Sequence, residues 1–68
     1  MPEADAKLSN REVAVLSWTA DGKTSNEISC ILNITERTVN FHIKNAMAKL
    51  NASNKTSAAI KAAMLGLL

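Results

Sequence analysis

Residues 35–50 read TERTVNFHIKNAMAKL, and this stretch carries the clearest helical pattern in the chain. An α-helix turns by about 100° per residue, so residues three, four or seven positions apart share one side. One side of this stretch is aliphatic and consists of Val39, Ile43, Ala46 and Leu50, with Met47 at its edge. The opposite side is polar or aromatic and consists of Arg37, Asn40, Phe41 and Lys44. The pattern predicts a helix at 36–50 that buries the first side and exposes the second.

Capping residues divide the rest of the chain into further helices. Four short polar residues stand where N-caps are expected, and two of them precede a glutamate by three positions, which makes a capping box. These N-caps are Ser9 (with Glu12), Thr24 (with Glu27), Thr35, and Ser53 or Asn54. Three residues that tolerate a left-handed backbone follow as stops, namely Gly22, Asn33 and Gly66. The sequence therefore predicts an all-α, four-helix fold with helices at about 10–20, 25–32, 36–50 and 55–65.

The second and third predicted helices are joined by about three residues, so they must cross at a steep angle. Asn33 suits the left-handed turn between them. Ser29, four positions earlier, is small, as a residue must be where two backbones approach closely. This arrangement is typical of a helix-turn-helix, here at about 25–50.

The composition indicates one small globular domain. The chain has 68 residues, of which 47% are hydrophobic, so we expect a flexible leader at 1–7 and a folded domain at 8–68. One cysteine and one histidine cannot form an internal disulfide or a zinc site with about four protein ligands. No apolar run approaches the ~20 residues of a membrane span. We expect a cytoplasmic protein without metal or cofactor.

The charge of the chain is unevenly distributed. Residues 1–36 contain three basic and six acidic residues, whereas residues 37–68 contain five basic and no acidic residues. With an isoelectric point near 9.0, the purely basic second half indicates a polyanionic partner. An acidic protein or an anionic lipid surface would also match this charge.

The last predicted helix is apolar nearly all round, so one core contact cannot cover it. We expect it to pair with the same helix of a second copy through small residues, and the predicted dimerisation residues are Ala59, Ala62, Ala63 and Leu67. The alternative is that a further domain covers it. In the first helix, Trp18 points off the inner face and is expected to cover the leader or an external partner. Glu12 is expected to cap its helix, and a bridge to a later basic residue is an alternative.

Several motifs resemble the LuxR-type (LuxR/FixJ) helix-turn-helix domain of bacterial transcription regulators. The matching stretches are Leu8-Ser9-x-Arg11-Glu12, Val15-Leu16, Gly22-Lys23-Thr24-Ser25-x-Glu27-Ile28, Leu32-x-Ile34-Thr35-Glu36-x-Thr38-Val39 and His42-x-x-Asn45-x-x-x-Lys49-Leu50. Residues 18–22 and 39–42 look most like the quorum-sensing branch, whose members carry an acyl-homoserine-lactone-binding domain before this one. The chain departs from the family at Ala14, where an acid is common, and at Ala46, where a larger aliphatic residue is common.

The resemblance implies that helix 36–50 enters the major groove of DNA. Asn40 and Lys44 match the family's base readers, in agreement with their place on the exposed side, and Phe41 could meet a thymine methyl group. We expect the N-termini of the second and third helices, with nearby side chains, to hold phosphates. The predicted phosphate-binding residues are Lys23, Thr24, Ser25, Asn26, Thr35, Arg37, Thr38, Asn45, Lys49 and Lys55. His42 is expected to be structural.

The leading hypothesis is therefore sequence-specific DNA binding by a transcription regulator, as a dimer on a two-fold-related site in double-stranded DNA. The alternative is a protein-interaction module whose basic helix docks an acidic partner, such as an anti-activator, and RNA polymerase is a further candidate partner. No small molecule is expected within this domain. An enzyme is not expected, since the sequence has no nucleophile–base pair, carboxylate dyad or glycine-rich phosphate loop.

Overall fold

The computed structural model describes residues 7–68, and this part of the chain is all-α. Its four helices are α1 (Asn10–Ala20), α2 (Ser25–Leu32), α3 (Glu36–Leu50) and α4 (Lys55–Met64). The predicted fold class is confirmed, with α4 ending one residue earlier than expected. Apart from Lys7, the predicted leader lies outside the described residues.

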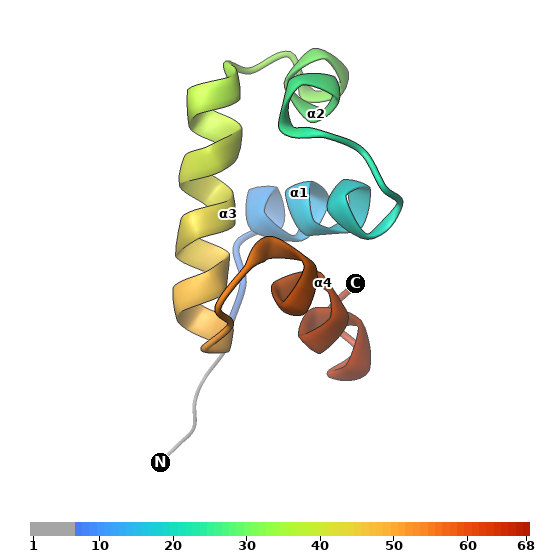
Figure 1. The fold of residues 1–68 in the computed structure, drawn as a ribbon, viewed down its shortest axis with the longest axis vertical. Helices are drawn as coiled ribbons and strands as arrows, with labels where there is room; N and C mark the ends of the chain where they lie inside the picture. Colours follow the sequence, from blue (N-terminus) through green and yellow to red (C-terminus); the bar gives the residue numbers. More distant parts are fainter. Residues whose placement is uncertain (1–6) are drawn as a thin grey trace.

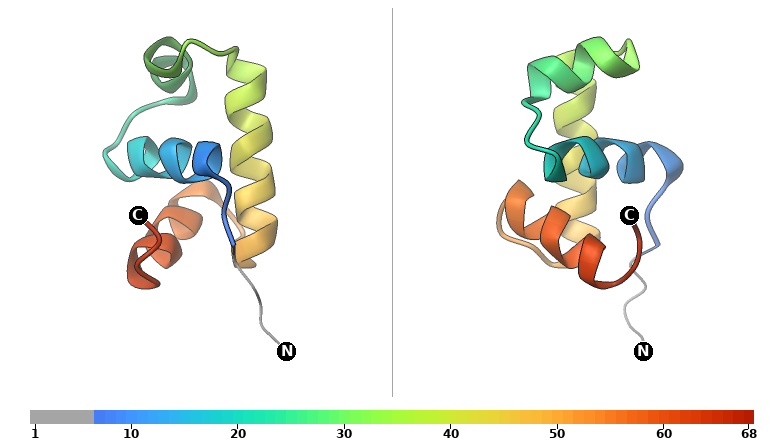
Figure 2. Two further views of the ribbon diagram at one scale, coloured as in Figure 1. Left: turned by 180° about the vertical axis from the view of Figure 1, so that it is seen from behind. Right: turned by 90° about the vertical axis from the view of Figure 1, so that its right-hand side faces the viewer.

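Helix α3 is the axis of the fold. Figures 1 and 2 show the other three helices on one side of α3, with α1 between α2 and α4. Helix α3 packs against α1, α2 and α4, whereas α2 and α4 do not touch each other within residues 7–68. The three shorter helices therefore cover one side of α3 and leave its other side open.

Each helix begins at an N-cap of the predicted type. Ser9 and Thr24 form complete capping boxes, in which the backbone N–H of Ser9 donates to Glu12 at 2.9 Å and that of Thr24 donates to Glu27 at 2.8 Å. Thr35 accepts from the backbone N–H of Thr38 at 3.1 Å. At α4 the cap is Asn54, which accepts from the backbone N–H of Ser57 at 2.8 Å. The predicted caps are confirmed, and Asn54 is the one used of the two candidates.

The four helices also end in the same way. After each helix a residue with positive φ is followed by a residue whose N–H donates to the carbonyl five positions earlier, which is the Schellman arrangement. The positive-φ residues are Gly22, Asn33, Asn51 and Gly66, with φ of 90°, 55°, 55° and 72°. The residues after the last three, Ile34, Ala52 and Leu67, pack against the core. Each turn thus sends the chain back toward the interior.

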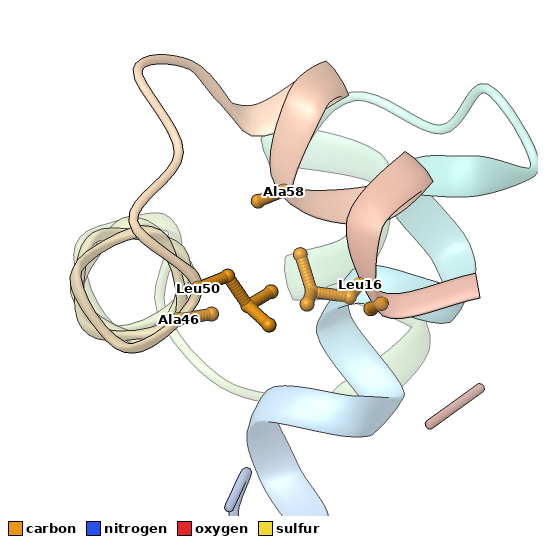
Figure 3. Close-up of a cluster of buried hydrophobic side chains, with 5 residues drawn as sticks. Leu16, Ala46, Leu50 and Ala58 are labelled. Atoms are coloured by element: carbon orange, nitrogen blue, oxygen red, sulfur yellow. The ribbon is translucent and has the colours of Figure 1, made fainter. Parts of the chain in front are cut away.

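The core consists of two clusters that share α1 and α3. In the first, Leu16 of α1 meets Ala46 and Leu50 of α3 and Ala58 and Ala62 of α4, as Figure 3 shows for the labelled residues. In the second, Val15, Ile28, Val39 and Ile43 join α1, α2 and α3. The first half of α3 therefore packs against α2, and the second half packs against α4. The predicted aliphatic side of α3 is confirmed, since all four of its residues are buried.

Two expectations about apolar residues are corrected. Trp18 does not point away from the inner face but packs half-buried against the second cluster. Ala59 and Ala62, predicted as dimerisation residues, are only 3% and 0% exposed within a single chain. Small residues are needed there because α4 lies close against α1 and α3, so these alanines serve the chain's own packing.

An ion pair connects the first turn of α1 with the last turn of α3. Glu12 of α1 is 4% exposed, and its carboxylate accepts a hydrogen bond from Nζ of Lys49 in α3 at 2.8 Å. Burial acts to raise the pKa of Glu12, but the hydrogen bonds from Lys49 and from Ser9, with the Lys49 charge, outweigh burial and lower it. The bridge that the sequence left as an alternative is therefore present. It holds the start of α1 against the last turn of α3.

Lys49→Met should destabilise the domain at neutral pH by about 1–2 kcal/mol, because it leaves the buried Glu12 carboxylate without its charged partner. The folded-state pKa of Glu12 is lowered, so its stabilising contribution is present above the usual carboxyl pKa and is lost as pH falls through the folded value. We expect the urea unfolding midpoints of the unmodified chain and of Lys49→Met to converge as the pH falls below the usual glutamate pKa of about 4.3 and through the lower folded value. Lys44→Met, on the exposed side of the same helix, should change stability by less than about 0.5 kcal/mol. Equal losses for the two variants would contradict this role of Lys49.

Asn33→Ala should destabilise the domain by about 1 kcal/mol, because a residue with a Cβ and no local hydrogen-bonding group is strained at the left-handed backbone of Asn33. Asn33→Gly should be close to the unmodified chain, since glycine adopts this conformation freely. Thermal unfolding followed by circular dichroism measures the difference. An alanine variant as stable as the glycine variant would show that the turn does not depend on this conformation.

Candidate nucleic-acid interface

The open side of α3 carries the residues that the sequence places on the polar face. We call Arg37, Asn40, Phe41 and Lys44 the α3 outer face; all four are exposed, and Phe41 is 59% exposed. Their position follows from helix geometry, because burial of Val39, Ile43, Ala46 and Leu50 turns the opposite side outward. In the right-hand view of Figure 2, α3 runs behind the other three helices, so its far side is free of them.

The N-termini of α2 and α3 supply backbone donors. In each helix the first two N–H groups precede the capped one and have no partner inside the helix. These donors belong to Ser25 and Asn26 in α2, and to Glu36 and Arg37 in α3. Helix N-termini carry partial positive charge and bind anions such as phosphate.

Several predicted phosphate-binding side chains have other roles in the folded chain. The hydroxyls of Thr24 and Thr35 accept cap hydrogen bonds, and the hydroxyl of Thr38 lies 2.9 Å from that of Thr35. The Ser25 hydroxyl donates to Asn40 of the α3 outer face at 2.8 Å. Of these residues, Ser25 keeps a backbone N–H group without a partner inside its helix, whereas the backbone N–H groups of Thr24 and Thr38 donate to Glu27 and Thr35.

The remaining candidates differ in accessibility. Asn26, Arg37 and Lys55 are exposed, whereas Lys23 and Asn45 are half-buried. His42, beside the buried stripe, is half-buried and meets the Phe41 ring edge-on at a centroid distance of 5.7 Å.

Some of the basic side chains at 37–68 bind other groups of the same chain, and the others are left without a partner in residues 7–68. Lys49 is paired with Glu12. Lys61, which sequence reasoning did not single out, donates to the carbonyls of Asn51 and Leu50 at 2.8 and 3.4 Å and so caps the C-terminal end of α3. Of the five basic residues at 37–68, Arg37, Lys44 and Lys55 make neither an ion pair nor a side-chain hydrogen bond within the described residues. The sequence alone does not indicate this role of Lys61, because the contact depends on how α4 crosses the end of α3.

The carboxylate of Glu27, in the first turn of α2, accepts a hydrogen bond from the cap of its own helix. The hydrogen bond from the Thr24 backbone N–H lowers the pKa of Glu27, which is also close to the positive charge of Lys23. Glu27 therefore serves the cap of α2 at neutral pH.

Across residues 7–68, no group of three metal-ligating side chains is present, and none of the helices is long and apolar enough to cross a membrane.

Comparison with protein families gives one match that covers most of the chain. Residues 6–62 match the profile described as "Bacterial regulatory proteins, luxR family". Among individual proteins, the chain is 66% identical over 61 residues to the transcriptional activator protein AnoR of Acinetobacter nosocomialis, covering 90% of the chain and 26% of AnoR. It is 61% identical over 61 residues to the quorum-sensing regulator RhlR of Pseudomonas aeruginosa, covering 90% of the chain and 25% of RhlR. The chain thus spans about a quarter of the length of these relatives.

Solved structures agree with this match. The structure resembles that of Escherichia coli SdiA with a TM-score of 0.88 and 52% identity, over 98% of this chain and 28% of SdiA. It also resembles the transcription factor GerE with a TM-score of 0.85 and 33% identity, over 90% of this chain and 91% of that one. The GerE chain therefore consists almost entirely of the fold described above.

Proposed function

The chain belongs to the luxR family of bacterial regulatory proteins, and we propose that it reads DNA sequence with α3 in the major groove. It is the DNA-binding domain of a transcriptional regulator and is not an enzyme. The observation that carries the proposal is the α3 outer face, which is polar and aromatic, partly cationic, and exposed at all four of its residues. A helix about 10–12 Å wide fits a groove about 12 Å wide.

The base-reading residues in this proposal are Asn40, Lys44 and Phe41. Lys44 can donate to the acceptors of guanine, and the Asn40 amide can bond to base edges. Phe41 has no polar group and would contact a thymine methyl group or a sugar. This assignment is supported by the exposure of all three side chains on one face of α3.

Phosphate groups would be bound by the N-termini of α2 and α3 and by the basic side chains that have no partner in the described part of the chain. The proposed contacts are Lys23, Thr24, Ser25, Asn26, Thr35, Arg37, Thr38, Asn45 and Lys55, with Ser25 acting through its backbone N–H group at the start of α2. Lys49 is the weakest of the predicted contacts, because its ammonium group is bound to Glu12. Phosphate contacts of this kind orient the protein on the duplex without reading its sequence.

The outer side of α4 supports dimerisation through Ala63, one of the residues first expected, together with two residues that were not. Ile60 and Met64 are 55% and 82% exposed, and with Ala63 they follow the i, i+3, i+4 spacing of one helix face. We propose that this face pairs with its copy in a second chain, so that two α3 helices bind a two-fold-related site. Leu67, also predicted at the interface, packs against the chain's own core.

One wider role rests on the relatives, and an alternative role rests on the charge of the α3 outer face. RhlR is named as a quorum-sensing regulator, and we propose the same class of parent protein for this domain. The basic outer face could instead dock an acidic protein, with RNA polymerase as a candidate. Charge alone does not separate DNA from an acidic protein, so the following experiment is designed to do so.

Asn40→Ala and Lys44→Ala should each reduce discrimination between base pairs by about 1–3 kcal/mol, because each removes a base-edge contact. The probe is the duplex that the unmodified chain selects from a random pool, and binding to its single-base variants is measured by fluorescence anisotropy. The logarithm of affinity should fall with the logarithm of salt concentration, with a slope of about −0.9 for each phosphate contacted.

Lys55→Ala is the matched control for these variants. Removing a phosphate contact should weaken binding to all duplexes equally and reduce the salt slope by about one contact. A flat salt dependence, or full discrimination retained in both the Asn40 and Lys44 variants, would contradict base reading by α3. Binding of an acidic protein in place of DNA would favour the alternative function.

Met64→Glu should weaken self-association, because it places a charge in the apolar contact between two copies of α4. Sedimentation equilibrium of the unmodified chain from micromolar to millimolar concentration should show a rising mass, and the variant should stay monomeric to higher concentration. Ser17→Glu, at an exposed site of α1, should leave the mass unchanged. A constant monomer mass for the unmodified chain would remove α4 as the dimer contact.

A further inference from the structure

A single side-chain hydrogen bond joins the two helices of the helix-turn-helix. Ser25 is the first residue of α2, and its hydroxyl donates to Oδ1 of Asn40 in α3 at 2.8 Å. No other side-chain to side-chain hydrogen bond connects α2 with α3 within residues 7–68. Ser25 is half-buried, whereas Asn40 is exposed on the α3 outer face. The bond therefore runs from the support helix to a residue proposed to read bases.

This bond decides how the Asn40 amide is presented. An asparagine amide has one acceptor oxygen and one nitrogen with two N–H donors. Because Oδ1 accepts from Ser25, one end of the amide is held toward α2. The donor end, Nδ2, has no hydrogen-bond partner among the described residues. An exposed asparagine without such a bond would sample several rotamers, and ordering it would then add to the cost of binding.

We propose that Ser25 is a positioning residue for base recognition, which holds the Asn40 amide so that its N–H donors face the DNA. This role rests on the proposed function and deepens it. The base edge favoured by such an amide carries acceptors in the major groove, as do guanine O6 and N7 or thymine O4. Pairing with adenine through both amide atoms remains compatible only through the second lone pair of Oδ1.

The proposal also separates two roles of Ser25 that the sequence could not distinguish. The predicted phosphate contact needs only its backbone N–H at the start of α2, which points along the helix axis. The hydroxyl is engaged with Asn40. Removing the hydroxyl should therefore alter base preference while leaving the backbone contact in place.

The first measurement uses the free chain. In Ser25→Ala, nuclear magnetic resonance should show a shifted Asn40 side-chain amide and averaged χ1 couplings, because the bond that holds the amide is gone. Ser25→Thr, which keeps a hydroxyl, should preserve the signals of the unmodified chain. Ser17→Ala, a serine change at an exposed helical site, should leave the Asn40 amide unchanged. Thermal unfolding of each variant checks that the fold is retained.

The second measurement is a double-mutant cycle on the duplex selected by the unmodified chain and its single-base variants. Ser25→Ala should lower discrimination about fivefold, the size expected for one hydrogen bond, at the base pair whose discrimination is lost in Asn40→Ala. In the Asn40→Ala background, Ser25→Ala should have no further effect, because its route of action is already removed. Ser25→Thr should restore discrimination.

Two results would overturn the role of Ser25 and leave the proposed function in place. One is an equal loss of affinity for all duplexes that persists in the Asn40→Ala background, which would identify the hydroxyl as a phosphate contact. The other is an Asn40 amide that does not respond to Ser25→Ala in the free chain. A chain that prefers no duplex sequence would overturn the proposed function, and with it this role of Ser25. The amide signals of the free chain distinguish that failure from loss of the hydrogen bond itself.

Discussion

Burial of one aliphatic side of α3 is the constraint on which the rest of the structure depends. Val39 and Ile43 lie in the cluster shared with α2, and Ala46 and Leu50 lie in the cluster shared with α4, while α1 contributes to both. The stripe thus fixes three helices on one side of a fourth. Because an α-helix presents its two sides together, the same burial that stabilises the domain also orients the α3 outer face.

Local hydrogen bonding compensates for the small size of this core. The helices have 8 to 15 residues, and isolated helices of about this length are marginal in water. Each has a side-chain N-cap, and each is followed by a left-handed residue and a returning hydrogen bond. These bonds satisfy backbone groups that a chain of 68 residues could not bury or pair otherwise. They also determine where α2 and α3 begin, and therefore where the proposed phosphate donors lie.

The electrostatics of the chain divide between holding the fold and facing a partner. Lys49 neutralises a buried carboxylate, and Lys61 binds the carbonyls at the end of α3. Arg37, Lys44 and Lys55 are left at the surface, so charge alone is a modest part of the proposed interface. In the proposed function, the helix N-termini and the polar side chains of α3 carry the rest of the binding. The Ser25–Asn40 bond orders one of these side chains.

Most of the fold could be predicted from the sequence, because helices, caps and left-handed turns depend on residues three to five positions apart. The buried stripe of α3 and the exposure of Asn40, Phe41 and Lys44 follow from the same local period. Only the tertiary structure decided which distant residues meet. Trp18 packs half-buried against the second cluster and Ala59 is buried. Lys49 is paired with a residue 37 positions away, and Ser25 bonds to Asn40 across 15 positions. These contacts depend on how the helices cross, and a crossing angle is set by packing of whole surfaces, which no short stretch of sequence encodes.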